Sequence, residues 1–475
     1  MKYILHLLIA VQCIVCLLIA RGQSATLITA FTNPVPSRDD YFGGSIAALG
    51  SDRLLIGASG RTSIYTNPAV YLFNTNGQWL TTFTNPGPRD NIFYGESVAA
   101  VGTDRVLIGT YQSGIRFGTE NAYLFNTNGA LVITFTNPPG SVGPSFGRSV
   151  AALGGDRVLI GAPFDSSGGR EGLVHLFSTN GQWLNTCTNP APGSGSWFGT
   201  AVTAVGNDRI LIGAPFNDLG ATDAGTAYLF STNGILTVTF TNPTPLSVER
   251  FGSAVAPFGN DRVLIGAPRD STAAPFGGAA YLFSNNGLLL TTFTNPSPAY
   301  SSTGFESLDG DWFGASVAAV GNDRVLIGAY GNDAPNGTRY AGTAYLFSTN
   351  GTLLATLTNP VPTSGASFGG ALAASGPDRF LIGAPAFALG ATNAGRAYLF
   401  SVPLPPSLSI RLTTSNTVAV SWPSVATGFA LQQNTRGLSS VNWSNVTGTI
   451  QDNGTNRFIT LSPQSGSRFY RLVQP

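Results

Sequence analysis

The chain has 475 residues, of which only 10% are charged, and its formal net charge is +1. A chain so weakly charged offers no basic face to a phosphate backbone, so nucleic acid is excluded as a partner. The length allows more than one domain, and 59 glycines with 11% aromatic residues favour short strands joined by tight turns.

Residues 1–25 have the pattern of a secretory signal peptide. Lys2 precedes an apolar run over residues 3–20, and small residues follow up to Ala25. We expect cleavage between residues 20 and 25, and hence a secreted or cell-surface protein with no membrane span. The alternative is an uncleaved membrane anchor, because the apolar run approaches the length that spans a bilayer.

Removal of this peptide would leave Cys187 as the only cysteine and His175 as the only histidine. A single thiol forms no disulfide framework, so packing must stabilise the protein. One histidine also argues against histidine-dependent catalysis and against a histidine-rich metal site. His175 replaces a tyrosine and Cys187 a phenylalanine of the repeated pattern described below, so we expect both to be buried strand residues.

Residues 26–401 consist of a repeated unit. The dipeptide Asp-Arg recurs seven times at intervals of 52 to 62 residues, each time before a hydrophobic run. A period of this size indicates a solenoid, a propeller or another repeat array. The dipeptides begin at Asp52, Asp104, Asp156, Asp208, Asp261, Asp323 and Asp378.

The unit from Phe198 to Pro243 predicts four antiparallel strands. Gly206-Asn207-Asp208 and Asn233-Gly234 supply tight turns after the first and third strands. Pro215 ends the second strand because proline cannot donate to the ladder. Four strands without a helical period describe a propeller blade, so seven units predict an all-β, seven-bladed β-propeller. The expected strands cover residues 200–205, 209–213, 226–230 and 235–240.

The two ends of the repeat region predict that the propeller is closed by its N-terminal strand. The seventh unit stops after its third strand at residues 397–400, where a proline-rich segment replaces the fourth. Residues 27–34 form a fourth strand with no unit before them. We therefore expect this N-terminal strand to complete the seventh blade, which removes an unpaired sheet edge.

A Phe-Gly pair opens the units and Gly-Ala-Pro follows their second strands, and this pattern resembles the FG-GAP repeat of integrin α-subunit propellers. The resemblance implies an extracellular propeller that serves cell adhesion or ligand binding. The Phe-Gly pair begins at Phe42, Phe146, Phe198, Phe251, Phe313 and Phe368, with Tyr94 as a variant. Gly-Ala-Pro begins at Gly161, Gly213, Gly266 and Gly383 and is altered at Gly57, Gly109 and Gly328.

The sequence departs from the family at the turns between first and second strands. There several blades of the family carry an acidic calcium loop, whereas this chain has a short turn such as Gly206-Asn207-Asp208. Calcium takes about six to eight oxygen ligands, so one Asp per turn does not suffice, and we expect no cofactor. We expect a structural role for Asp-Arg, with Asp satisfying turn amides and Arg lying along the sheet rim or pairing with a neighbour.

The variable loops indicate where a site could lie. Alternating strand direction places the second-to-third loops and the interblade connections on one face, and the tight turns on the other; function usually occupies such variable loops. Carboxylates and aromatic rings that converge near the sixth blade would suit a cation or a sugar ring, and the alternative is a solvated acidic loop. The candidate ligand-binding residues are Glu306, Asp309, Asp311, Trp312, Asp333 and Tyr340. Equivalent loops of other units hold Asp165, Asp218, Asp223 and Asp270, which would share an ion only by converging at the axis.

Residues 408–475 have a different pattern and follow a proline-rich linker at 402–407. Alternating segments such as 418–422 and 458–461 predict short strands, with Trp422 and Trp443 as core residues. We expect a small β-sandwich, which resembles the fibronectin type III-like tails of secreted bacterial repeat proteins.

Together these features favour a monomeric, non-catalytic binding or adhesion scaffold for an extracellular protein or glycan. A surface-layer or matrix component would differ only in its partner. The alternative is a carboxylate-dependent polysaccharide hydrolase or lyase with its site at the mouth of the propeller channel, because propellers also host enzymes.

Overall fold

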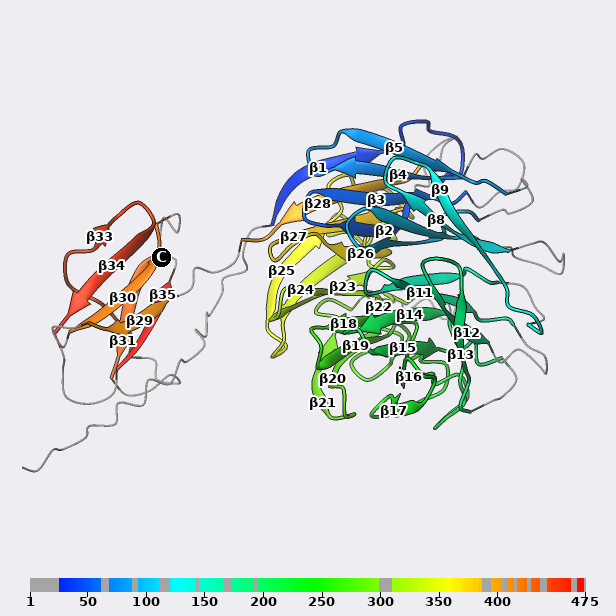
Figure 1. Cartoon of the computed structure of the whole chain (residues 1–475). Helices are drawn as coiled ribbons and strands as arrows, with labels where there is room; N and C mark the ends of the chain where they lie inside the picture. Colours follow the sequence, from blue (N-terminus) through cyan, green and yellow to red (C-terminus); the bar gives the residue numbers. More distant parts are fainter. Residues whose placement is uncertain are drawn as a thin grey trace, which may run out of the picture. The chain divides into compact units, whose positions relative to one another are not determined.

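The computed structural model is all-β, as the sequence predicts, and divides into two compact units, one ending at Pro403 and the other beginning at Leu404 (Figure 1). Residues 1–24 of the expected signal peptide lie outside the described residues, and so do Glu306 and Asp309. The structure describes residues 25–60, 68–87, 93–111, 120–141, 145–165, 172–191, 195–298, 310–386, 394–403, 408–413, 417–424, 429–435, 442–462 and 468–473.

The described part of the first unit contains seven four-stranded antiparallel sheets. Six of them use consecutive strands: β2 (Phe42–Leu49), β3 (Arg53–Ala58), β4 (Ala69–Asn74) and β5 (Trp79–Thr84); β6 (Ser97–Val101), β7 (Arg105–Gly109), β8 (Asn121–Asn126) and β9 (Leu131–Thr136); β10 (Ser149–Leu153), β11 (Arg157–Ala162), β12 (Leu173–Ser178) and β13 (Trp183–Thr188); β14 (Ala201–Val205), β15 (Arg209–Ala214), β16 (Thr226–Ser231) and β17 (Leu236–Thr241); β18 (Ala254–Phe258), β19 (Arg262–Ala267), β20 (Ala279–Ser284) and β21 (Leu289–Thr294); β22 (Phe313–Val320), β23 (Arg324–Ala329), β24 (Thr343–Ser348) and β25 (Leu353–Thr358). The strands predicted for residues 200–240 are confirmed to within one residue at each end.

The remaining sheet joins the two ends of the repeat region. It contains β26 (Ala371–Ala374), β27 (Arg379–Ala384), β28 (Arg396–Ser401) and, at its outer edge, β1 (Thr26–Thr32). β1 pairs antiparallel with β28, so the predicted pairing of the N-terminal strand with the last unit is confirmed. The first strands β2, β6, β10, β14, β18, β22 and β26 contact one another in this order, and β26 also contacts β2. The series of sheets therefore returns to its start.

The Phe-Gly and Gly-Ala-Pro motifs mark the closest approach between neighbouring sheets. A Cβ on Gly213, within the second strand of one sheet, would collide with the carbonyl oxygen of Gly252 just before the first strand of the next. Gly252 itself has a φ of 90°, a conformation that favours glycine, and its N–H donates to the carbonyl of Gly266 at 2.9 Å. Gly383 meets Gly43 in the same way between the last and first sheets. The motifs recur because each sheet needs this backbone contact.

The hydrophobic core lies between neighbouring sheets. One cluster combines Leu211 and Phe240 of the β14–β17 sheet with Phe251, Ile265 and Tyr281 of the following repeat. The second strands read as unbroken apolar runs because both of their faces are covered. Each sheet therefore depends on its two neighbours for burial.

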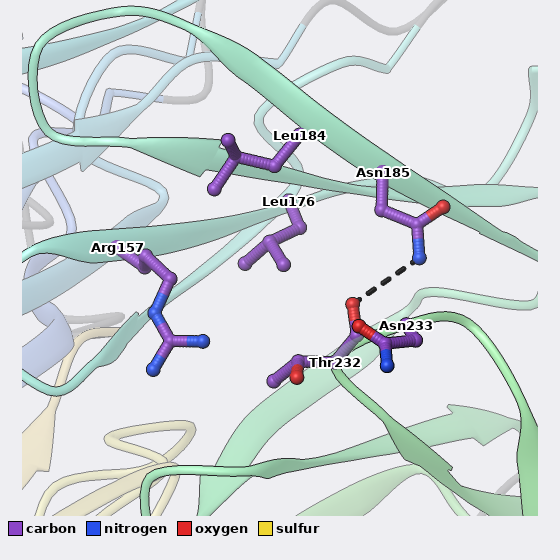
Figure 2. A pocket seen from close by; sticks show the side chains of 6 residues that line it. All are labelled: Arg157, Leu176, Leu184, Asn185, Thr232 and Asn233. Atoms are coloured by element: carbon purple, nitrogen blue, oxygen red, sulfur yellow. Dashed lines mark hydrogen bonds between the residues drawn. The ribbon is translucent and has the colours of Figure 1, made fainter.

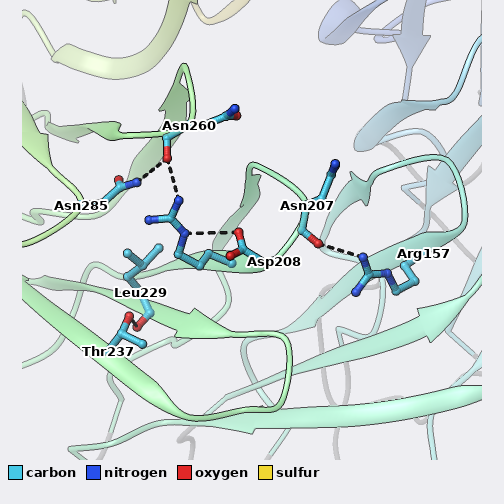
Figure 3. Close-up of polar contacts among 8 residues, drawn as sticks. Arg157, Asn207, Asp208, Leu229, Thr237, Asn260 and Asn285 are labelled. Atoms are coloured by element: carbon cyan, nitrogen blue, oxygen red, sulfur yellow. Dashed lines mark hydrogen bonds and ion pairs between the residues drawn. The ribbon is translucent and has the colours of Figure 1, made fainter.

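The Asp-Arg pairs link neighbouring sheets at their tight turns (Figure 3). Nη2 of Arg157 donates to the carbonyl of Asn207 at 2.8 Å, and Arg379 in the last repeat donates to Ser51 in the first at 2.9 Å. The structural role predicted for Arg is confirmed. The prediction for Asp needs correction: the carbonyl of Asp208 accepts from the turn amide of Thr232, whereas the exposed carboxylate lies 3.4 Å from the Nε of its own Arg209. The other links run from Arg53 to Thr103, Arg105 to Gly155, Arg209 to Asn260, Arg262 to Asn322 and Arg324 to Pro377.

The second unit has two antiparallel sheets around a small core. Trp422 is buried there with Leu431 and Ile459, as predicted, but Trp443 is not a core residue. It precedes a two-residue strand and remains partly exposed, and the guanidinium of Arg471 lies 4.3 Å from its ring centroid. One sheet contains β29 (Ser409–Leu412), β30 (Val418–Pro423), β34 (Asn456–Leu461) and β33 (Gln451–Asp452), and the other β32 (Ser444–Asn445), β31 (Ala430–Asn434) and β35 (Phe469–Val473).

Candidate functional site

The ends of the sheets opposite the tight turns form the variable-loop face. The residues before Phe-Gly and those after Gly-Ala-Pro meet there, because the first two strands of each sheet are antiparallel. In the β14–β17 sheet the N–H of Phe216 donates to the carbonyl of Ser196 at 3.3 Å. Two positions per repeat therefore contribute side chains to the same end of each sheet.

Asp311, one of the predicted ligand residues, belongs to a buried hydrogen-bond network. Its side chain is only 4% exposed and accepts from the Nδ2 of Asn295 at 2.8 Å. Asn295 also donates to Asn332, which donates to the hydroxyl of Tyr345 at 2.7 Å. Burial, with a smaller effect of Asp311, raises the pKa of Tyr345 to about 12. The alternative of a solvated acidic loop is therefore wrong for Asp311, because its carboxylate is buried and binds Asn295 of the preceding repeat.

The other described candidates lie in two separate arrangements. Trp312 packs on Tyr330 with ring centroids 5.3 Å apart. The carboxylate of Asp333 accepts from the main-chain N–H of Tyr340 at 2.9 Å, which closes a loop, and the carbonyl of Tyr340 accepts from Ser367 in the next repeat. These contacts do not bring Asp311, Asp333 and Tyr340 together around one ligand.

In some repeats, buried carboxylates of the variable loops accept hydrogen bonds from the asparagine that follows the fourth strand. Nδ2 of Asn242 donates to Glu249 at 2.6 Å and to Asp270 at 2.8 Å, and Asn137 donates to Asp165 at 2.9 Å. Burial, with a smaller contribution from Asp270, raises the pKa of Glu249 to about 7. Asp165 and Asp270 therefore bind separate asparagines and do not converge on a shared ion.

A chain of aromatic contacts crosses the variable-loop face, and our sequence analysis did not identify it. Phe93 stacks on Tyr111 at 5.5 Å between centroids, and Tyr111 lies 6.2 Å from Phe164 in the next sheet. Phe164 meets Trp197 edge-on at 4.7 Å, and Trp197 lies 4.2 Å from Phe216. All five side chains are partly exposed. Rings from three neighbouring repeats thus form one surface.

Arginines extend this surface toward the sixth repeat. The guanidinium of Arg250 lies 4.7 Å from the centroid of Phe216, and that of Arg269 lies 5.8 Å from Trp312, which packs on Tyr330. We call the nine residues the aromatic arc: Phe93, Tyr111, Phe164, Trp197, Phe216, Arg250, Arg269, Trp312 and Tyr330. The available sequence signal was the large residue directly before Phe-Gly in several repeats.

The backbone is strained at this position. Trp197, Arg250 and Trp312 have φ values of 53°, 59° and 58°, which large side chains seldom adopt. Such conformations cost about 1–3 kcal/mol each and persist only where the surrounding structure holds them. At each position the residue's carbonyl accepts from a main-chain N–H three residues later, that of Thr200 at 3.1 Å, of Ser253 at 3.2 Å and of Ala315 at 3.0 Å, which closes a turn.

His175 and Cys187 are buried strand residues, as predicted. Burial lowers the pKa of His175 to about 4 and raises that of Cys187 to about 12. Neither is suited to proton transfer or nucleophilic attack near neutral pH.

A groove of 380 Å³ lies between the third and fourth repeats, at the tight-turn end (Figure 2). Nδ2 of Asn185 donates to the carbonyl of Thr232 across it at 3.2 Å. Its lining combines aliphatic and amide groups and contains no acid-base pair: Arg157, Leu176, Leu184, Asn185, Thr232 and Asn233. Within the described ranges, no three His, Cys, Asp or Glu side chains lie close enough together to hold a metal ion.

Repeated four-stranded antiparallel sheets with a shared glycine contact define a β-propeller-type repeat protein. The family model of the FG-GAP repeat matches residues 192–230 and 306–347, so the chain carries FG-GAP repeats and the resemblance seen in the sequence is confirmed. No curated protein matches the chain. In the described part there is no helix of the length and hydropathy needed to span a bilayer.

Proposed function

We propose that the first unit is a closed seven-bladed β-propeller that acts as a secreted or cell-surface, non-catalytic binding scaffold. The pairing of β1 with β28 and the contact of β26 with β2 support the closure. FG-GAP repeats are typical of extracellular proteins, in agreement with the expected signal peptide at residues 1–25. In this proposal the propeller covers residues 26–401.

The aromatic arc carries the proposal of binding. Aromatic side chains bury much apolar area at little entropic cost, and stack on planar or ring-shaped ligands. The arc joins five consecutive repeats and lies where the loops vary, and all of its residues except the buried Arg269 are partly exposed. If these rings served only to pack the core, they would be buried, as Phe198 is next to Trp197 and Phe251 is next to Arg250.

The arc gives less support to the alternative function, that of a polysaccharide hydrolase or lyase. Glu96 forms a 2.8 Å ion pair with Arg148, whose guanidinium also lies 4.8 Å from the ring of Tyr111. Glu249 has a raised pKa but is fully buried, out of reach of a polymer. Glycoside hydrolysis needs a pair of accessible carboxylates, and the nine residues that make up the arc include none.

We also propose a fibronectin type III-like β-sandwich for residues 408–475, joined through a linker at 402–407. The two small sheets around Trp422 support this assignment. Its partner would be extracellular, and its two sheets suit a spacer or a second contact surface.

Binding of the purified protein to a glycan array, with and without calcium, tests the proposed function. Trp197→Ala should weaken binding to any ligand found, because it removes the centre of the arc. Trp183→Ala is the matched control, since that ring is 49% exposed on an outer strand away from the arc. Turnover of a polysaccharide panel, without stable binding to any glycan, would favour the enzyme and overturn the scaffold.

A further inference from the structure

The second unit is basic, whereas the repeat region is acidic. Residues 404–475 contain five arginines and one acidic residue, which gives them a formal net charge of +4. Residues 26–401 contain 17 arginines and 22 acidic residues. The small net charge of the whole chain therefore combines two units of opposite sign, and the second unit attracts anionic partners. Its arginines are Arg411, Arg436, Arg457, Arg468 and Arg471.

Asp452, the single acidic residue of the second unit, already has its partners. Its Oδ2 lies 3.1 Å from the Nε of Arg457, and its Oδ1 accepts from the hydroxyl of Ser424 at 2.5 Å and from the N–H of Gly454 at 2.9 Å. The hydrogen bond from Ser424, followed by those from Gly454 and Arg457, lowers the pKa of Asp452, so the carboxylate stays ionised. The unit has no second acidic side chain that could pair with Arg471.

Arg471 lies in a row of polar side chains on the three-stranded sheet of this unit. It is opposite Gln432, which is opposite Asn445, so the row crosses β35, β31 and β32. The adjacent residues Leu431 and Leu472 are buried, so the row lies on the face away from the core. Nε2 of Gln432 donates to the Oδ1 of Asn445 at 3.1 Å.

The guanidinium of Arg471 is held in place by two neighbours. Its Nε and Nη2 both donate to the Oε1 of Gln432, at 2.9 and 2.7 Å, and its carbon lies 4.3 Å from the ring centroid of Trp443. The remaining N–H groups of the two terminal nitrogens can bind an anion with two oxygens. Because the planar group is already oriented, binding costs less conformational entropy.

Resting on the proposed extracellular binding function, we propose that this row binds an acidic polysaccharide and anchors the protein to it. Arg471 binds a carboxylate of the polymer, and the exposed amide of Asn445 binds sugar hydroxyls. The partly exposed ring of Trp443 adds apolar contact with a sugar ring. A row of amides suits a polymer rich in hydroxyl groups better than the acyl chains of a lipid surface. We call Trp443, Arg471, Gln432 and Asn445 the arginine row.

Titration calorimetry of the full chain with a short oligomannuronate tests this inference, and the β-1,4-linked manno-oligosaccharide of equal length is the matched neutral ligand. We expect the acidic ligand to bind at least about tenfold more tightly in low salt, and this preference to shrink as salt is added. Arg471→Gln should weaken acidic binding about tenfold. Arg457→Gln makes the same change in charge within the same unit, but at an arginine paired with Asp452, and should weaken it less than about twofold. Arg471→Lys, which keeps the charge without the planar donors, should lie between the two.

Three results would overturn the inference. Equal affinity of the wild type for the two saccharides would exclude acid specificity. An equal loss in Arg471→Gln and Arg457→Gln would assign the preference to net charge alone and not to the row. Binding to vesicles that contain phosphatidylserine, without binding to oligomannuronate, would assign the basic unit to a lipid surface.

The aromatic arc separates this inference from the proposed function of the propeller. Trp197→Ala should leave oligomannuronate binding unchanged, because Trp197 belongs to the first unit. Loss of that binding in Trp197→Ala would place the acidic ligand on the arc and overturn the inference. Absence of oligomannuronate binding, together with glycan binding that Trp197→Ala weakens, would also overturn it and leave the propeller scaffold standing.

Discussion

His175 should make the protein sensitive to acid. Its ring is 1% exposed; Nδ1 contacts the hydroxyl of Thr186 at 2.9 Å, whereas Nε2 is buried without a partner. Protonation of Nε2 in the folded state would bury an uncompensated charge, so burial lowers the folded-state pKa to about 4. The unfolded chain binds the proton with the ordinary pKa of 6.5.

The magnitude follows from the difference between these two pKa values. The contribution of neutral His175 to stability is present above the unfolded pKa and is lost as the pH falls toward the folded pKa. With a difference of about 2.5 pH units, the free energy of unfolding should fall by about 2 kcal/mol at pH 5 and by about 3 kcal/mol at pH 4, relative to pH 7.

Urea unfolding of the wild type and of His175→Tyr between about pH 4 and pH 7 measures this effect. The variant restores the residue found at the equivalent position in the other repeats, such as Tyr123 and Tyr228. Because Glu249 and the other acids titrate alike in both proteins, the difference between them isolates His175. A stability difference independent of pH would refute the reasoning.

Three further perturbations test separate parts of the fold. Glu249→Gln should raise the free energy of unfolding by about 2 to 3 kcal/mol above pH 7 and change it little below pH 4.5, because the folded carboxyl, with its raised pKa of about 7, favours the protonated form. A stability change that is the same across this pH range would contradict the prediction. Arg324→Ala, which removes a 2% exposed side chain bound to the carbonyl of the buried Val402, should cost about 2 to 4 kcal/mol, against about 1 kcal/mol for the more exposed Arg157→Ala; equal urea midpoints would refute the difference. Phe31→Ala in β1 should cost about 3 to 5 kcal/mol in one cooperative transition, whereas unchanged unfolding would show that β1 does not close the sheet series.

Much of the candidate site lay outside what the sequence could predict. Trp312 was selected, but as part of an acidic loop and not as a neighbour of Arg269. Asp311 was expected to face a ligand and instead binds Asn295 inside the protein. The position of the Asp311 side chain depends on how the variable loop packs against the preceding sheet. No local sequence pattern encodes that packing.

The sequence by itself determined the strands, the turns and the pairing of β1 with the last repeat. Turn residues such as Asn233-Gly234 specify the local backbone, and the period of the repeats fixes where each unit begins. Both signals can be recognised in the sequence without knowing which sheets contact one another. Only the tertiary structure decided that Phe93 and Phe216, more than a hundred residues apart, belong to one surface. That surface exists because glycine contacts bring successive sheets together at one end, where side chains of separate repeats touch.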